Sequence, residues 1–134
     1  MEATVMTTDD RKVARSLALS HDWHQRMVAD FPELFAPGFG FECLGGWRFL
    51  LREMCKRIML LAPEDREWTM FSQVKEKFGT LRAYHAGGPR VDEIVDWAEE
   101  ASERTCDVCG RPGSLRNSGG WYATRCDDHD GWTG

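Results

Sequence analysis

The sequence predicts an α+β fold: N-terminal helices, a β-hairpin and an amphipathic helix, followed by a small C-terminal module. Apolar residues recur at helical spacing over 47–61 and 91–101, whereas residues 80–85 alternate as in a strand. Two closely spaced pairs of potential metal ligands lie near the end of the chain. With 134 residues the chain suits a single globular unit. We therefore expect a flexible tail (1–10), an α+β body (11–105) and a module (106–134) packed on that body.

The first expected helical region begins at Asp10 and ends at Phe31, because the residue before Pro32 avoids the helical conformation. Ser20 and Asp22 are good N-cap residues and can divide this region into two helices. His21 and His24 lie three residues apart, and a second metal site there is conceivable. One buried and one solvated helical histidine is the favoured interpretation, because the spacing implies no further ligand.

After a loop at 36–40, the clearest amphipathic helix of the chain covers 47–61 and ends at Ala62-Pro63. Its apolar face contains Trp47, Leu50, Leu51, Met54, Cys55, Ile58 and Leu61. Its other face is basic and contains Arg48, Arg52, Lys56 and Arg57. Such stripes are usually solvated, and binding of a partner is the alternative.

The expected β-hairpin has a first strand over 67–74, a turn over 75–79 and a returning strand over 80–85. Gly87-Gly88-Pro89 ends the second strand. The following helix places Val91, Val95 and Ala98 on one face, and its other face is acidic. This helix continues directly into Cys106, so we expect the C-terminal module to be docked on it.

Cys106 and Cys109 form one ligand pair, and Cys126 and His129 form the other. Two residues separate the members of each pair, which lets both side chains reach one tetrahedral Zn²⁺. Four protein ligands leave no open position, so the sequence predicts one structural zinc ion. A redox dithiol at Cys106 and Cys109 is the rival interpretation, disfavoured because metal would occupy the thiolates.

Between the two ligand pairs, residues 114–116 and 121–124 flank the Gly-rich turn 117–120, which indicates a second hairpin. Only five residues follow His129, so any helix carrying the last pair is one turn long at most. Knuckle, hairpin and ligand-bearing turn together predict a curtailed treble-clef or zinc-ribbon-like module.

The net charge of −5 argues against attraction of the whole molecule to nucleic acid or to an anionic membrane. No apolar run approaches the length of a membrane span, and residues 1–15 lack the apolar core of a signal peptide. Cys43 and Cys55 remain outside the ligand set, and a disulfide between them is the minor alternative. Free thiols beside a thiolate metal site favour the reducing cytoplasm.

Three stretches together are similar to a known family: Gly40 to Trp47, Gln73 to Arg82 (QVKEKFGTLR), and the CxxCG…GW…CxxH pattern of the last 30 residues. They resemble a family of small, largely uncharacterised zinc-finger proteins of bacteria, phages and prophages. The likeness covers about residues 24–130. It implies no established activity, but it implies a phage-associated context in which small proteins often act by binding host machinery.

A zinc ion with four protein ligands stabilises the fold but offers no open position for catalysis. The favoured function is therefore that of a non-enzymatic binding protein. Its candidate surface combines basic and aromatic residues that suit single-stranded nucleic acid: Lys75, Lys77, Phe78, Arg82 and Tyr84, with Arg90 and Trp121 nearby. The alternative is that the aromatic residues pack the sheet while the lysines are merely solvated. Neither a membrane nor a small-molecule substrate is expected.

A second hypothesis is a phage-encoded inhibitor of a host defence complex, such as a CRISPR effector. The acidic helix face would then occupy a basic groove built for nucleic acid; this face contains Asp92, Asp96, Glu99, Glu100 and Glu103.

The remaining hypothesis is a nuclease, because treble clefs also form His-metal nuclease sites. His85 is the candidate general base, with Glu76 or Asp92 as imaginable metal ligands. No Ser–His–Asp spacing, phosphate-binding loop or deaminase signature is present in the sequence.

Overall fold

The computed structural model describes residues 22–132, and within them the α+β class is confirmed. This described part contains three α-helices: α2 (Asp22–Asp30), α3 (Arg48–Met59) and α4 (Pro89–Ser102). The four strands form two separate antiparallel hairpins: β1 (Phe71–Lys77) with β2 (Thr80–His85), and β3 (Ser114–Ser118) with β4 (Trp121–Arg125). The expected tail at 1–10, the beginning of the first helical region and His21 lie outside the described residues.

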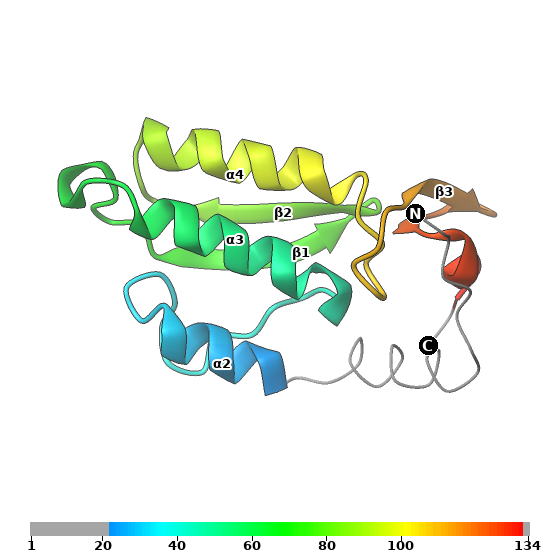
Figure 1. The fold of residues 1–134 in the computed structure, drawn as a ribbon, viewed down its shortest axis with the longest axis horizontal. Helices are drawn as coiled ribbons and strands as arrows, with labels where there is room; N and C mark the ends of the chain where they lie inside the picture. Colours follow the sequence, from blue (N-terminus) through cyan, green and yellow to red (C-terminus); the bar gives the residue numbers. More distant parts are fainter. Residues whose placement is uncertain (1–21, 133–134) are drawn as a thin grey trace, which may run out of the picture.

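Helices α3 and α4 lie side by side along the β1–β2 hairpin, and α2 lies beyond α3 (Figure 1). The hairpin turns Val74, Leu81 and Ala83 inward, where they join one core with apolar residues of all three helices. Leu51 and Val91, from α3 and α4, are fully buried in that core. The helical periodicities therefore correspond to faces that are buried in the structure.

The first strand differs from its expected position. β1 covers Phe71–Lys77 instead of 67–74, and the turn consists of Phe78 and Gly79 alone. Both turn residues have positive φ (52° and 86°), as in the two-residue turn that matches strand twist. Trp68, expected in the strand, instead occupies a turn with φ 62°. Its exposed indole and conformation are incompatible with a half-buried strand.

Both edges of the β1–β2 hairpin are occupied by other parts of the chain. Glu42 lies along β1, where its N–H donates to the Val74 carbonyl and its carbonyl accepts the N–H of Glu76. Along β2, the Leu81 N–H donates to Ser102 Oγ (2.9 Å) and the Ala83 N–H donates to a Glu99 carboxylate oxygen (3.1 Å). Strand edges that are paired in this way no longer offer a template to another chain.

The second hairpin, β3–β4, lies at the end of the molecule away from the loop that joins α3 to β1 (Figure 1). It is followed by one 3₁₀ turn, η3 (Asp127–His129). A second apolar cluster forms around Cys106, Val108 and Cys126. No helix among residues 22–132 combines the length and apolar character that crossing a bilayer requires.

Candidate metal centre

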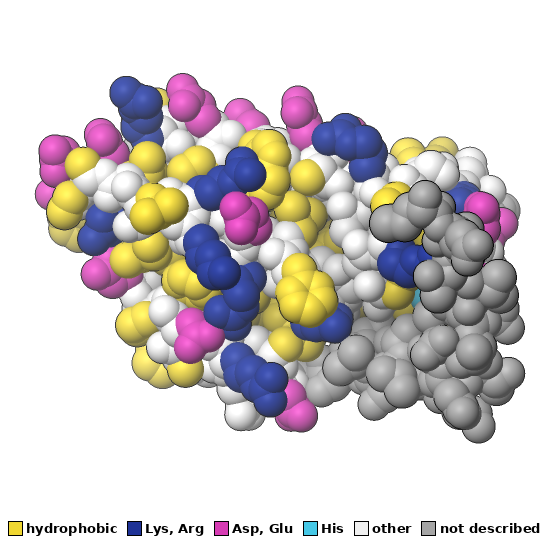
Figure 2. All heavy atoms as spheres, viewed as in Figure 1, with side chains coloured by type: hydrophobic (Ala, Val, Ile, Leu, Met, Phe, Trp, Pro, Cys, Tyr) yellow, Lys and Arg dark blue, Asp and Glu magenta, His cyan; other side chains and the backbone are white. Residues whose placement is uncertain are grey.

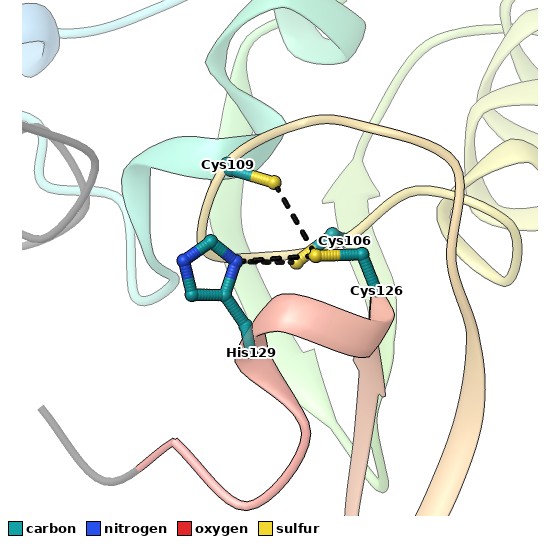
Figure 3. A group of neighbouring side chains, drawn as sticks. All are labelled: Cys106, Cys109, Cys126 and His129. Atoms are coloured by element: carbon teal, nitrogen blue, oxygen red, sulfur yellow. Dashed lines mark hydrogen bonds between the residues drawn. The ribbon is translucent and has the colours of Figure 1, made fainter. Parts of the chain in front are cut away.

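Cys106, Cys109, Cys126 and His129 meet in one cluster at this end of the molecule (Figure 3). Their ligand atoms all lie within 4.8 Å of one another. The cluster draws on three segments: the turn after α4 supplies Cys106 and Cys109, Cys126 follows β4, and His129 closes η3. The two pairs that the sequence predicts as ligands are thus brought together in space.

The distances within the cluster suit a tetrahedral ion. Cys109 Sγ lies 3.7 Å from Cys126 Sγ, and His129 Nδ1 lies 3.7 Å from Cys106 Sγ and 3.2 Å from Cys126 Sγ. Two sulfurs bound at about 2.3 Å to a tetrahedral zinc ion lie about 3.8 Å apart. The Cys3His tetrad could therefore hold one metal ion, and its soft thiolate donors suit zinc.

The first ligand pair lies on a tight turn closed by the backbone. The N–H of Gly110 donates to the Cys106 carbonyl (2.9 Å), and the N–H of Cys106 donates to the Arg111 carbonyl (2.8 Å). Gly110 adopts φ 80°, a conformation that favours glycine. This turn directs both thiols to the same side, as a metal knuckle requires.

A buried ion pair connects the two halves of the cluster. Arg125 Nε lies 2.6 Å from Asp107 Oδ1, and both side chains are less than a tenth exposed. The same guanidinium donates to the carbonyls of His129 (3.4 Å) and Trp132 (2.8 Å). Arg125 therefore ties the first knuckle to the turn that bears His129, and so it positions ligands without being one.

The charge state of the cluster depends on contacts among the thiols. A hydrogen bond from the Cys109 thiol lowers the pKa of Cys106 to about 4. The same bond and burial raise the pKa of Cys109, while burial raises that of Cys126. In this geometry the contacts among the thiols favour the thiolate at Cys106 and the protonated thiol at Cys109 and Cys126, and binding of a cation would displace the thiol protons. Burial also raises the pKa of Asp107 to about 6, although Arg125 opposes the shift.

Close backbone contacts join the module to the body. The Gly46 N–H donates to the Asp107 carbonyl (2.9 Å), and the Trp47 indole donates to the Thr105 carbonyl (2.9 Å). A Cβ on Gly46 would lie 2.4 Å from the Asp107 carbonyl group, so only glycine allows this approach. On the other side of the module, Thr124 Oγ1 donates to the Gly79 carbonyl (2.7 Å).

Asp107, Arg125 and Gly46 were not singled out by the sequence, although signals for them exist. Asp107 lies between the two ligands of the first pair, and Arg125 directly precedes the second. Opposite charges at these positions could have indicated an ion pair within the site. Gly46 belongs to a stretch that carries the family resemblance, but its close approach to Asp107 depends on tertiary packing.

The predicted basic and aromatic residues gather on the β1–β2 hairpin. Lys75 pairs with Arg82, and Tyr84 pairs with Gln73, so these four lie on the face opposite to the core. Lys77 lies on the same face, next to the turn, and Phe78 projects from the tip with 70% of its surface exposed. Arg90 and Trp121 lie elsewhere, on α4 and β4.

The predicted acidic residues lie on α4 or at its C-cap, but two of them have local roles. Glu99 accepts the Ala83 N–H, and Asp92 lies 2.9 Å from His85 Nε2. Asp96, Glu100 and Glu103 are exposed. Asp92 also remains 62% exposed, so Glu99 alone among the five is partly withdrawn from this acidic face.

Of the residues named for a nuclease site, His85 and Asp92 lie together, whereas Glu76 lies apart from them. His85 lies at the end of β2, where its Nδ1 accepts the Gly87 N–H (2.9 Å) and its Nε2 faces Asp92. Glu76 lies near the other end of the hairpin and accepts the Gly79 N–H (2.7 Å). His85 and Glu76 therefore do not share a site.

Scans of this chain against protein-family models, curated proteins and solved structures each find no match. The resemblance to phage and bacterial zinc-finger proteins therefore stays a prediction.

Proposed function

We propose that the cluster binds one structural Zn²⁺ and that the protein is a non-enzymatic binding module. The observation that carries this proposal is the set of four mutually close protein ligands, three of them buried. Four such ligands complete a tetrahedral sphere and leave no position for a reacting water or substrate. The ion would then contribute folding energy, and function would depend on the surface that it stabilises.

The surface that best supports binding is the outer face of the β1–β2 hairpin, which we call the basic face. It consists of Gln73, Lys75, Lys77, Arg82 and Tyr84, with Phe78 at its tip. Tyr84 and Phe78 are 44% and 70% exposed, so both rings can receive a stacked base. Basic side chains beside exposed rings are typical of sites for single-stranded nucleic acid.

The net charge of −5 does not oppose such binding, because basic residues predominate on this face. One acidic residue, Glu42, also lies beside Lys75, and its carboxylate accepts a hydrogen bond from Gln73 Nε2 (2.6 Å). Asp96, Glu100 and Glu103 are exposed on α4 or at its C-cap, whereas the basic face lies on the side of the hairpin opposite to the core. Glu76 turns to the other side of the strand and is engaged by the turn. Phosphates would thus meet a locally positive surface.

The metal centre supports this surface through the second hairpin. Thr124 lies two residues before Cys126 and bonds to the carbonyl of Gly79, directly beside Phe78. A Cβ on Gly79 would lie 2.6 Å from a methyl carbon of Leu115, so the two hairpins touch at this point. Ordering of the zinc module would therefore hold the tip of the basic face in place.

The proposal is tested by fluorescence anisotropy of the zinc-loaded protein with a labelled oligo-dT of about 20 nucleotides. Binding should weaken steeply between about 50 and 200 mM salt. The double variant Lys75→Ala/Lys77→Ala should lower the affinity at least about tenfold and reduce the salt slope by about 2. Tyr84→Ala should weaken binding without changing that slope.

Lys56→Ala serves as the matched control, because Lys56 is an exposed lysine on α3, away from the basic face. Equal losses for Lys56→Ala and the double variant would contradict a specific face. No binding at about 100 µM protein and low salt would refute the nucleic-acid proposal. The zinc proposal stands separately on measurement of stoichiometric metal.

A further inference from the structure

The loop between α3 and β1, residues 60–70, contains an exposed and strained tryptophan. Trp68 is 82% exposed and has φ 62°. The Thr69 N–H donates to the Arg66 carbonyl (3.3 Å), which places Trp68 third in a four-residue turn. Of the described non-glycine residues, only Trp68 and Phe78 have positive φ, so Glu67 does not. A turn with positive φ at its third residue normally has glycine or asparagine there.

This conformation is imposed by well-defined contacts around the turn. The Arg66 guanidinium donates to the Leu61 carbonyl (2.6 Å) and lies 3.3 Å from a Glu33 carboxylate oxygen. The Phe71 N–H donates to the Leu34 carbonyl (2.8 Å), and Thr69 is buried. The turn is therefore fixed on both sides of Trp68. A left-handed bulky residue persists only where its surroundings over-determine it, and such residues cluster at functional sites.

Trp68 does not stand alone. Together with Pro63 and Met70 it lines a surface hollow of about 520 Å³, which also touches Glu33 and Glu67. Met70 is 47% exposed, and Leu60, at the start of the loop, is 86% exposed. Figure 2 shows hydrophobic and acidic side chains, with some basic ones among them, at the end of the molecule where Figure 1 places this loop. We call Pro63, Trp68 and Met70 the loop patch.

The charges around the loop patch are mostly negative. Glu33, Glu64, Asp65 and Glu67 are all exposed, whereas Arg66, the basic residue of the loop, is half-buried against Glu33. Phosphates would be repelled here, and so would the same loop of a second copy. An apolar pocket with a basic rim would complement both the indole and its surroundings.

We propose that the loop patch is a protein-docking site, with Trp68 as the anchor that enters an apolar, lysine- or arginine-rimmed pocket of the partner. Tryptophan is enriched among the residues that dominate interface energies. The site lies at the opposite end of the molecule from the zinc module and does not depend on nucleic-acid binding by the basic face (Figure 1). The basic face and the acidic surroundings of the loop patch would let the protein bind two different macromolecules at separate places.

The test is selection of a displayed random peptide library on the intact zinc-loaded protein, followed by titration of the selected synthetic peptides. We expect sequences that combine Lys or Arg with large apolar residues. Trp68→Gly should weaken their binding at least about tenfold. This variant is expected to fold, because glycine suits the turn. Met70→Ser should also weaken binding, whereas Trp121→Ala, which removes a 75% exposed indole on β4, should not.

Three outcomes would overturn the proposal: no enrichment of peptides, enrichment of acidic peptides, or binding that Trp68→Gly leaves unchanged. Sedimentation of the wild type adds a fourth. If the protein self-associates and Trp68→Gly abolishes the association, the occupant is a second copy and not a basic-rimmed partner.

Discussion

The hydroxyl group of Thr124 in β4 donates a buried 2.7 Å hydrogen bond to the carbonyl of Gly79 at the tip of the β1–β2 hairpin. Thr124 is fully buried, and this bond links a residue next to the second ligand pair with the turn of the basic face. The two hairpins share no strand pairing, so their relative position depends on side-chain contacts of this kind.

Replacing Thr124 by valine keeps the volume but leaves the Gly79 carbonyl without this donor. We expect the free energy of unfolding in urea to fall by about 1–3 kcal/mol, the usual cost of an unsatisfied buried acceptor. Ser118→Ala, at an exposed position of the same hairpin, is the control and should change stability little. Equal stabilities of Thr124→Val and wild type would show that the bond contributes nothing.

Removal of zinc should unfold at least residues 104–134. Binding by a small zinc module is worth on the order of 10 kcal/mol, and the apolar cluster around Cys106 and Val108 is too small to replace it. Hydrogen exchange after chelation should therefore show loss of protection in β3 and β4. Far- and near-UV circular dichroism that stay unchanged on chelation would contradict a structural role.

Metal affinity should depend on pH in a defined way. Because the module is expected to unfold without zinc, its three cysteines then have ordinary thiol pKa values of about 8.5 and hold protons at neutral pH. Zinc binding should therefore release about three protons, and the apparent affinity should fall by up to about a thousandfold per unit as pH falls from about 7.5 to 6.5. Competition with a chromogenic chelator measures this slope. Release of two protons would instead indicate a folded metal-free cluster in which the lowered pKa of Cys106 keeps it a thiolate.

Gly46 should not tolerate a side chain. In Gly46→Ala the new Cβ would lie 2.4 Å from the Asp107 backbone, so the module and the body would have to separate. We expect a loss of about 3 kcal/mol or more in the free energy of unfolding. Gly40→Ala is the matched control, since a Cβ there meets nothing within 4 Å. Similar thermal midpoints for both variants would exclude the tight contact.

Trp68→Gly should stabilise the protein. Glycine removes the conformational cost of a bulky residue in the left-handed region, roughly 1–2 kcal/mol. Part of this gain is lost, because glycine also raises the conformational entropy of the unfolded chain. The net gain should be about 1 kcal/mol in urea unfolding. Phe78→Gly offers a comparison at the other positive-φ residue. A loss of stability in Trp68→Gly would mean that packing of the indole contributes more to stability than the left-handed backbone of Trp68 costs.

Much of the metal centre could be predicted from the sequence because ligand spacing is a local property. Two residues between Cys106 and Cys109, and between Cys126 and His129, suffice to place each pair on one short turn. Periodicity predicted α3 and α4 for a similar reason, since one face of each helix must be buried. The second hairpin followed from its Gly-rich turn.

The boundaries of β1 could not be predicted, because the turn residues are atypical. Phe78 and Trp68 both adopt left-handed conformations that sequence statistics assign to glycine and asparagine. The charged run Lys75, Glu76 and Lys77 resembles a turn, yet it alternates between the basic face and the covered face of a strand. Tertiary contacts, not local preference, decided this region.

Relations between distant segments were also beyond the sequence. The ion pair of Asp107 with Arg125 and the approach of Gly46 to Asp107 join residues far apart along the chain. The engagement of Asp92 and Glu99 by His85 and the Ala83 N–H is of the same kind. The helical pattern in the sequence shows that these acidic residues lie outside the apolar face of α4. It does not show that Asp92 and Glu99 bond to residues of β2.

The occupied borders of the first hairpin have a consequence for assembly. Because Glu42, Ser102 and Glu99 satisfy backbone groups along β1 and β2, edge-to-edge pairing of copies through this hairpin is disfavoured. A molecule that binds this hairpin would therefore contact the side chains of its outer face and would not pair with its strand edges. Single substitutions on that face could change the binding specificity without disturbing the backbone hydrogen bonds between β1 and β2.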